Sequence, residues 1–121
     1  MWATAVETEP AMEITVDRIK QDAVIKLSGR LDMNTSPNLR KTALTLYGRH
    51  GCRNLEVDFA EVPFIDTSGL ATLLEILVVS KEQSARLTLS GLNEKVRYLI
   101  DVNGLAGFFT IVNSAAERSD E

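Results

Sequence analysis

The segment Asp66-Thr67-Ser68 places three side chains that accept hydrogen bonds directly before an apolar run that begins at Leu70. Side chains of these types cap the unpaired N–H groups at the start of a helix, and a single residue is enough for that purpose. The surplus indicates a hydroxyl exposed for another use, and a helix N-terminus favours an anion such as phosphate. The residues alone leave two interpretations open: a capping cluster and nothing more, or a hydroxyl that can be modified.

The other side chains that could do chemistry are too few for an enzyme or a metal site. The only histidine, His50, lies in a predicted turn, and the only cysteine, Cys52, lies at a predicted strand start. We interpret His50 as a solvent-exposed turn residue and Cys52 as a small semi-buried residue. One histidine and one cysteine cannot complete a structural zinc site, and no Gly-x-x-x-x-Gly-Lys phosphate loop occurs. We therefore expect a protein that is not an enzyme and uses no cofactor and no metal.

Regular patterns along the chain predict the elements that must position these residues. Apolar residues at helical spacing predict helices that begin at Ser36-Pro37, at Ser68 and after Asn93, with Ser36 as the cap of the first and Asn93 as the cap of the last. Segments of alternating apolar residues predict strands, which are a hairpin within 13–28 and single strands at 55–59, 86–90 and 108–112.

The order of these elements is β, β, α, β, α, β, α, β. The later strands alternate with helices and should be parallel through right-handed crossovers, whereas the hairpin adds an antiparallel pair. We expect a single-domain α/β fold, a mixed and mostly parallel sheet of about five strands with three or four helices packed against it. Residues 13–112 form this domain, between a flexible leader, 1–12, and a flexible polar tail, 113–121.

Composition excludes several classes of protein. The net charge of −4 argues against a nucleic-acid binder, which needs clustered cations to neutralise phosphates. A single cysteine forms no internal disulfide, so a reducing compartment fits best. The N-terminus has no basic segment followed by an apolar run, and no apolar stretch approaches the roughly 20 residues that cross a bilayer. We expect a cytoplasmic protein with no direct membrane insertion.

The segment Asp66-Thr67-Ser68-Gly69-Leu70 resembles the phosphorylation motif of STAS domains, in particular of bacterial anti-sigma factor antagonists. Gly29-Arg30-Leu31-Asp32 is similar to the family's Gly-x-Leu-Asp loop, and Gly91-Leu92-Asn93 is similar to its last strand-to-helix connection. The resemblance covers essentially the whole folded part of the chain. It implies a STAS-like fold in which Ser68 is phosphorylated. Thr67 departs from the family pattern, because many members have serine there; it leaves the acceptor position intact but adds a second hydroxyl, which makes Thr67 the second choice of acceptor.

The resemblance also implies a function. Such a phosphoprotein is a binding switch that sequesters an anti-sigma factor with serine kinase activity while Ser68 is unphosphorylated, and releases it when Ser68 carries phosphate. A PP2C-type phosphatase resets the switch, which serves transcription regulation and the stress response in bacteria. Three alternatives use the same fold, namely a subunit of a lipid transporter, a component of a stress-signalling assembly and a nucleotide-binding STAS module.

Several residues near Ser68 are candidates for partner contact. We expect Asp32 and Asp66 at one pole of the sheet; the alternative roles are an Asx-turn for Asp32 and a helix cap, which we prefer, for Asp66. On the helix that follows, Ile76 and Val79 lie opposite the expected buried stripe, as a docking patch or as flank residues half-covered by loops. The expected stripe is Leu70, Leu73, Leu74, Leu77 and Val78. The predicted partner-binding residues are Asp32, Asp66, Thr67, Gly69, Thr72, Glu75, Ile76 and Val79.

Overall fold

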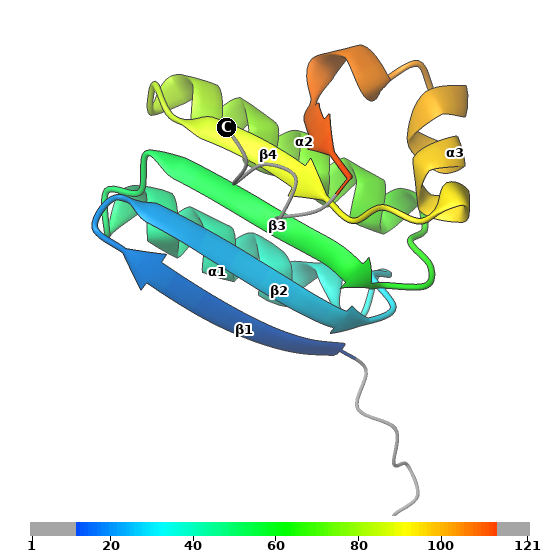
Figure 1. The fold of residues 1–121 in the computed structure, drawn as a ribbon, viewed down its shortest axis with the longest axis horizontal. Helices are drawn as coiled ribbons and strands as arrows, with labels where there is room; N and C mark the ends of the chain where they lie inside the picture. The colour runs from blue at the N-terminus through cyan, green and yellow to red at the C-terminus, as the bar shows by residue number, and fades with distance from the viewer. Residues whose placement is uncertain (1–11, 114–121) are drawn as a thin grey trace, which may run out of the picture.

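A computed structural model describes residues 12–113 of the chain (Figure 1). The elements follow in the order β1 (Met12–Ile19), β2 (Asp22–Gly29), α1 (Ser36–Gly48), β3 (Asn54–Glu61), α2 (Thr67–Glu82), β4 (Arg86–Ser90), α3 (Glu94–Val102), the 3-10 turn η2 (Ala106–Phe108) and β5 (Thr110–Val112). This order confirms the predicted α/β fold. The predicted leader and tail lie outside the described residues, except for Met12 and Asn113.

The five strands stand in the sheet in the same order as in the chain. β1 and β2 are antiparallel and are joined by a tight turn in which Lys20 adopts a φ of 57°. β2, β3, β4 and β5 are parallel, as the alternation of strands and helices predicts. Their amino ends therefore meet at one pole of the molecule and their carboxyl ends at the other. The turn that carries Ser68 follows the carboxyl end of β3.

The helices α1 and α2 lie side by side on one face of the sheet (Figure 1). The core between these layers consists of apolar side chains that are almost completely buried. Its strand residues include Ile25, Val57 and Leu89, and its helix residues include Leu39, Leu73 and Ile76. The opposite face of the sheet carries no helix within residues 12–113 (Figure 1). Glu56 is nevertheless buried on that face, where it accepts a hydrogen bond from Ser90 Oγ at 2.7 Å.

The buried stripe of α2 differs from the predicted one. Leu70 and Leu73 are buried as expected, but Val78 is 53% exposed and Ile76 is completely buried. The reason is that α2 packs against both the sheet and α1, so that a wide arc of an almost wholly apolar helix is covered. Helical spacing could not orient a helix with apolar residues on nearly every side.

Two smaller predictions about element ends were wrong. Ser36 is the first residue of α1 and not its cap; Thr35 precedes the helix, and its side chain makes no capping hydrogen bond. The last strand begins at Thr110, because the chain first makes the 3-10 turn that ends at Phe108. The predicted cap of α3 was right, since Asn93 Oδ1 accepts a hydrogen bond from the Val96 N–H at 2.8 Å.

Candidate functional site

The loop between β3 and α2 ends in a helix cap. Asp66 has an extended backbone, and its Oδ1 accepts a hydrogen bond from the Gly69 N–H at 2.9 Å. Its backbone carbonyl accepts a hydrogen bond from the Leu70 N–H at 3.0 Å. The geometry therefore shows the cap that we preferred for Asp66. Because one carboxylate supplies the cap, neither of the two hydroxyls that follow is needed for it.

Thr67 and Ser68 occupy the first two positions of α2. The Thr67 side chain is exposed, and the Ser68 side chain is partly exposed at the surface. Within residues 12–113, neither hydroxyl takes part in a hydrogen bond, and the N–H groups of both residues have no acceptor. Unpaired N–H groups and aligned peptide dipoles give this end of the helix a partial positive charge, which stabilises an anion.

A backbone clasp joins the loop after β2 to the loop before α2. Leu31 and Ile65 form an isolated parallel bridge, and both side chains are buried. The Leu31 N–H donates to the Phe64 carbonyl at 3.0 Å, and the Asp66 N–H donates to the Leu31 carbonyl at 3.1 Å. The loop that contains Asp32 and the loop that contains Asp66 are therefore held together, and they cannot separate without breaking these hydrogen bonds.

Gly69 is the point at which α2 approaches this clasp most closely. A Cβ atom at Gly69 would lie 2.8 Å from the carbonyl oxygen of Leu31 and 3.0 Å from its Cγ. These distances leave no room for a side chain, so the close approach requires glycine. Gly69 is buried, so that its role is steric. It does not lie on a surface for partner contact, contrary to our prediction.

The loop that contains Asp32 is an Asx-turn. Asp32 Oδ1 accepts hydrogen bonds from the Asn34 N–H at 2.9 Å and from the Thr35 N–H at 3.2 Å. The Thr35 hydroxyl donates to the Arg30 carbonyl at 2.7 Å and accepts from the Asp32 N–H at 2.9 Å. Of the two roles considered for Asp32, the turn is therefore present in the structure.

Two exposed apolar side chains beside these loops were missed by the sequence analysis. Met33 is 69% exposed and Phe64 is 41% exposed. The Arg30 guanidinium lies over the Phe64 ring, 4.9 Å from its centroid, which is within the range of a cation–π contact. The sequence holds no signal for either exposure, because a short loop does not reveal which of its apolar side chains faces solvent.

Carboxylates outnumber cations at this pole of the molecule. Asn93, at the start of α3, donates hydrogen bonds to the carbonyls of Val62 and Pro63, which brings the first turn of α3 beside the loop before α2. We call this end, where the carboxyl ends of the strands meet, the acidic pole. Its carboxylates are Glu13, Asp32, Asp58, Glu61, Asp66 and Glu94, and its cations are Arg30, Lys95 and Lys26, which pairs in register with Asp58.

The structure corrects the predicted contact face on α2. Thr72 and Ile76 are buried, so that they cannot form an outward docking patch. Glu75 pairs with Arg40 of α1 at 2.6 Å, which ties the two helices together, and Val79 is half-buried. The cause is the contact with α1, which covers the side of α2 that we expected to face solvent. Of the predicted set, Asp32, Asp66 and Thr67 are the ones that the fold brings to the surface near Ser68.

The described residues offer little for other chemistry. Within 12–113, no cluster of three or more His, Cys, Asp or Glu side chains could hold a metal ion. His50 is exposed, and Cys52 is buried, with a thiol pKa that burial raises. No helix in this part of the chain has the length and apolar character needed to cross a membrane.

Comparison with known proteins identifies the family. The family described as "Mlab, STAS domain" matches residues 14–113 of the chain. The chain belongs to the STAS domain family. This result confirms the resemblance inferred from the serine motif and the two loops.

Several relatives of this STAS domain carry names that describe a binding role. It is 26% identical over 96 residues to the anti-sigma-B factor antagonist of Staphylococcus epidermidis, which covers 78% of this chain and 88% of the relative. The crystal structure of an anti-sigma factor antagonist from Mycobacterium paratuberculosis has a TM-score of 0.80 at 19% identity, over 91% of this chain and 92% of that one. The phosphorylated form of the Bacillus cell fate determinant SpoIIAA has a TM-score of 0.71 at 19% identity, over 89% and 97%. An antagonist of this kind is a binding protein and not an enzyme, in agreement with the sequence prediction.

Proposed function

We propose that this STAS domain is an anti-sigma factor antagonist, and that phosphorylation of Ser68 controls its binding to the anti-sigma factor. The observation that carries the proposal is the position of Ser68, a partly exposed serine at the start of α2 whose hydroxyl has no partner within residues 12–113. The names of the relatives support the class of partner. That SpoIIAA has been solved in a phosphorylated form supports the kind of control.

The proposed effect of phosphate on binding is local. A phosphoserine carries about −1.5 to −2 charge at pH 7. The unpaired N–H groups at the start of α2 stabilise this charge, so that the fold changes little. A partner that docks over the turn meets a bulky anion beside Asp32 and Asp66, and loses affinity. Binding therefore fails well before the domain loses stability.

The partner surface proposed here has an apolar part and an acidic part. Met33 and Phe64 give the partner apolar area to bury, while the carboxylates of the acidic pole favour a partner with cationic side chains. The partner in this proposal has serine kinase activity, which adds the phosphate to Ser68, and a PP2C-type phosphatase removes it.

Affinity capture with three variants tests the proposal. Ser68→Asp should lose capture of the anti-sigma factor, whereas Ser68→Ala should capture it and accept no phosphate from its kinase. Thr67→Ala tests the second choice of acceptor, because it removes the neighbouring hydroxyl and should leave phosphorylation of Ser68 intact. Thermal unfolding of every variant should stay close to that of the wild type. Capture of a permease in place of an anti-sigma factor would contradict the proposal, as would normal capture by Ser68→Asp.

A further inference from the structure

The pole opposite Ser68 has the reverse charge. It consists of the β1–β2 turn and the loops that lead into β3 and β4, at the amino ends of the parallel strands (Figure 1). Within residues 12–113 the ion pairs are Arg40–Glu75 and Arg97–Asp101, so that no cation of this end is neutralised by an ion pair. We call this end the basic pole. Its exposed cations are Arg18, Lys20, Arg49, Arg53, Lys81 and Arg86, and its exposed carboxylates are Asp17, Asp22 and Glu82.

Backbone hydrogen bonds join the loops of the basic pole into one platform. The Arg53 N–H donates to the Gln21 carbonyl at 2.7 Å, and the Arg86 N–H donates to the Arg53 carbonyl at 2.8 Å. The Tyr47 hydroxyl, from the end of α1, donates to the Arg86 carbonyl at 2.8 Å. Three loops that are distant in sequence therefore present their side chains from a fixed base.

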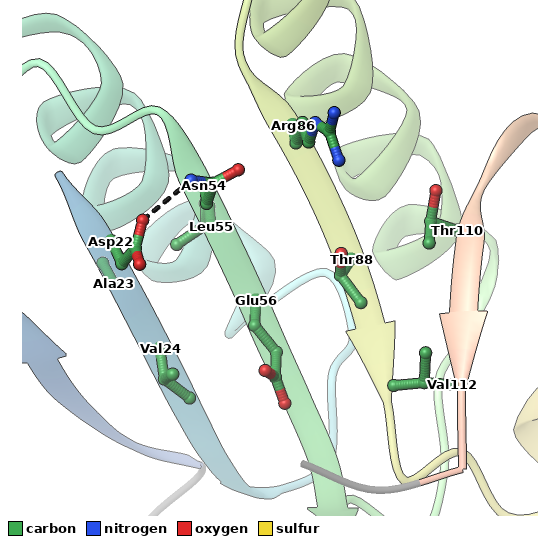
Figure 2. A pocket seen from close by; sticks show the side chains of 10 residues that line it. All are labelled: Asp22, Ala23, Val24, Asn54, Leu55, Glu56, Arg86, Thr88, Thr110 and Val112. Atoms are coloured by element: carbon green, nitrogen blue, oxygen red, sulfur yellow. Dashed lines mark hydrogen bonds between the residues drawn. The ribbon is translucent and has the colours of Figure 1, made fainter. Parts of the chain in front are cut away.

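A shallow depression of about 510 Å³ opens on this platform, and it suits a phosphate group. Its lining contains two guanidinium groups and no carboxylate: it consists of Gln21, Arg53, Asn54, Ser84 and Arg86. Figure 2 shows Arg86 at the amino end of β4, apart from Asp22, whose carboxylate accepts a hydrogen bond from Asn54 Nδ2 at 2.8 Å. Guanidinium groups bind phosphate oxygens through charge-assisted hydrogen bonds.

An exposed aliphatic side chain accompanies these cations. Ile19 is 73% exposed at the end of β1, between Arg18 and Lys20. An aliphatic residue flanked by cations gains energy at the boundary between lipid headgroups and acyl chains, where both kinds of group are satisfied. Duplex nucleic acid offers no such apolar layer, because its phosphates lie on the outside and its stacked bases expose only their edges in the grooves.

We propose that the basic pole docks this protein on the surface of an anionic phospholipid membrane. A headgroup phosphate occupies the depression between Arg53 and Arg86, and Ile19 contacts the boundary between headgroups and acyl chains. The surface attracts the basic pole and repels the acidic pole, so that the charge distribution alone orients the molecule. Ser68 then faces away from the membrane and stays accessible to kinase and partner. This docking is peripheral and does not depend on the proposed function.

Vesicle co-sedimentation of the full chain tests this docking. The protein should sediment with vesicles of phosphatidylglycerol and phosphatidylcholine, and should not sediment with phosphatidylcholine alone. Binding should fall steeply as salt rises from about 50 to about 300 mM, because the interaction is between exposed charges. Arg86→Glu should weaken binding by roughly tenfold or more, since the reversal removes an attraction of about 1 kcal/mol to the anionic surface and adds a repulsion of similar size. Ile19→Ser should weaken it several-fold.

Lys95→Glu is the matched control, because it makes the same change in net charge at the acidic pole and should leave vesicle binding unchanged. Circular dichroism establishes that each variant is folded, and Arg86→Gln replaces Arg86→Glu if the latter is not. Equal binding to neutral vesicles, or an equal loss in Lys95→Glu, would overturn the docking. So would complete competition by millimolar inorganic phosphate, or binding to duplex DNA as tight as to vesicles.

Discussion

The acidic and basic poles hold their charges in different ways. At the acidic pole three of the carboxylates are fixed by backbone N–H groups: Asp66 accepts from Gly69, Asp32 from Asn34, and Asp58 from Ala60. At the basic pole the cations end long side chains that form no ion pair within residues 12–113. Carboxylates in fixed positions favour binding to one partner of complementary shape. Cations at the ends of long side chains favour binding to a surface that has no defined pattern of charges. The poles thus separate specific binding from general attraction.

The largest expected effect is a loss of stability in the core between the poles. The core must be intact for either pole to form. Ile76→Asp places a carboxylate at a completely buried position, and we expect a loss of about 4 kcal/mol or more in the free energy of unfolding. Val78→Asp is the matched control, since Val78 is 53% exposed on the same helix and should change stability by less than about 1 kcal/mol. Urea unfolding followed by circular dichroism measures both. A folded Ile76→Asp that merely loses its partner would restore the docking patch predicted from sequence.

A glycine at each pole sharpens the comparison. Gly69→Ala forces the start of α2 away from Leu31, and we expect a loss of about 1 to 3 kcal/mol. Gly48→Ala, at the last residue of α1, meets no atom within 4 Å and should raise stability by up to about 1 kcal/mol through helix propensity. Thermal unfolding of the two variants shows directly whether each substitution lowers or raises stability. Equal effects would show that the clasp at the acidic pole is not a steric constraint.

The cap at the acidic pole should have a smaller effect. Asp66→Ala removes the acceptor of the Gly69 N–H and should cost about 1 kcal/mol, whereas Asp66→Asn keeps an acceptor oxygen and should cost much less. Chemical unfolding of both variants separates the cap from the charge. If partner binding falls equally in both, the negative charge of Asp66 contributes to recognition in addition to the cap.

The smallest expected effect is a pH dependence at the basic pole. Burial raises the pKa of the Cys52 thiol, against the opposing effects of a hydrogen bond with the Asn54 backbone and of the Arg18 cation. The folded state therefore holds the thiol proton more tightly than the unfolded chain, and the stability from this group is complete below pH about 8.5 and declines as the pH rises further. Unfolding in urea between pH about 7 and about 9.5 measures the decline, which Cys52→Ala should lack. An identical decline in that variant would assign it to another group.

The sequence predicted the order of elements and the parallel sheet, because strand alternation, glycines and caps such as Asn93 are local signals. It also predicted the helix cap at Asp66 and the position of Ser68 in the first turn of α2, because both residues lie in one continuous motif. It could not orient α2, where the burial of Ile76 depends on contact with α1. The steric role of Gly69 likewise depends on Leu31, which lies far away in the chain.

The basic pole was missed for a related reason. Its cations are spread from Arg18 to Arg86, so that no segment of the sequence is strongly basic. The net charge of −4 therefore gives no sign that cations gather at one pole and carboxylates at the other, because only the strand register places them there. Residues such as Met33 and Phe64 escaped notice because exposure cannot be inferred from a short loop.

The agreement between strand order in the sheet and strand order in the chain has a consequence for synthesis on the ribosome. Each strand pairs with the one made just before it, although a helix separates the two strands of the β2–β3 and β3–β4 parallel pairs. The nascent chain can therefore extend the sheet strand by strand as it emerges, and β5 closes the structure last.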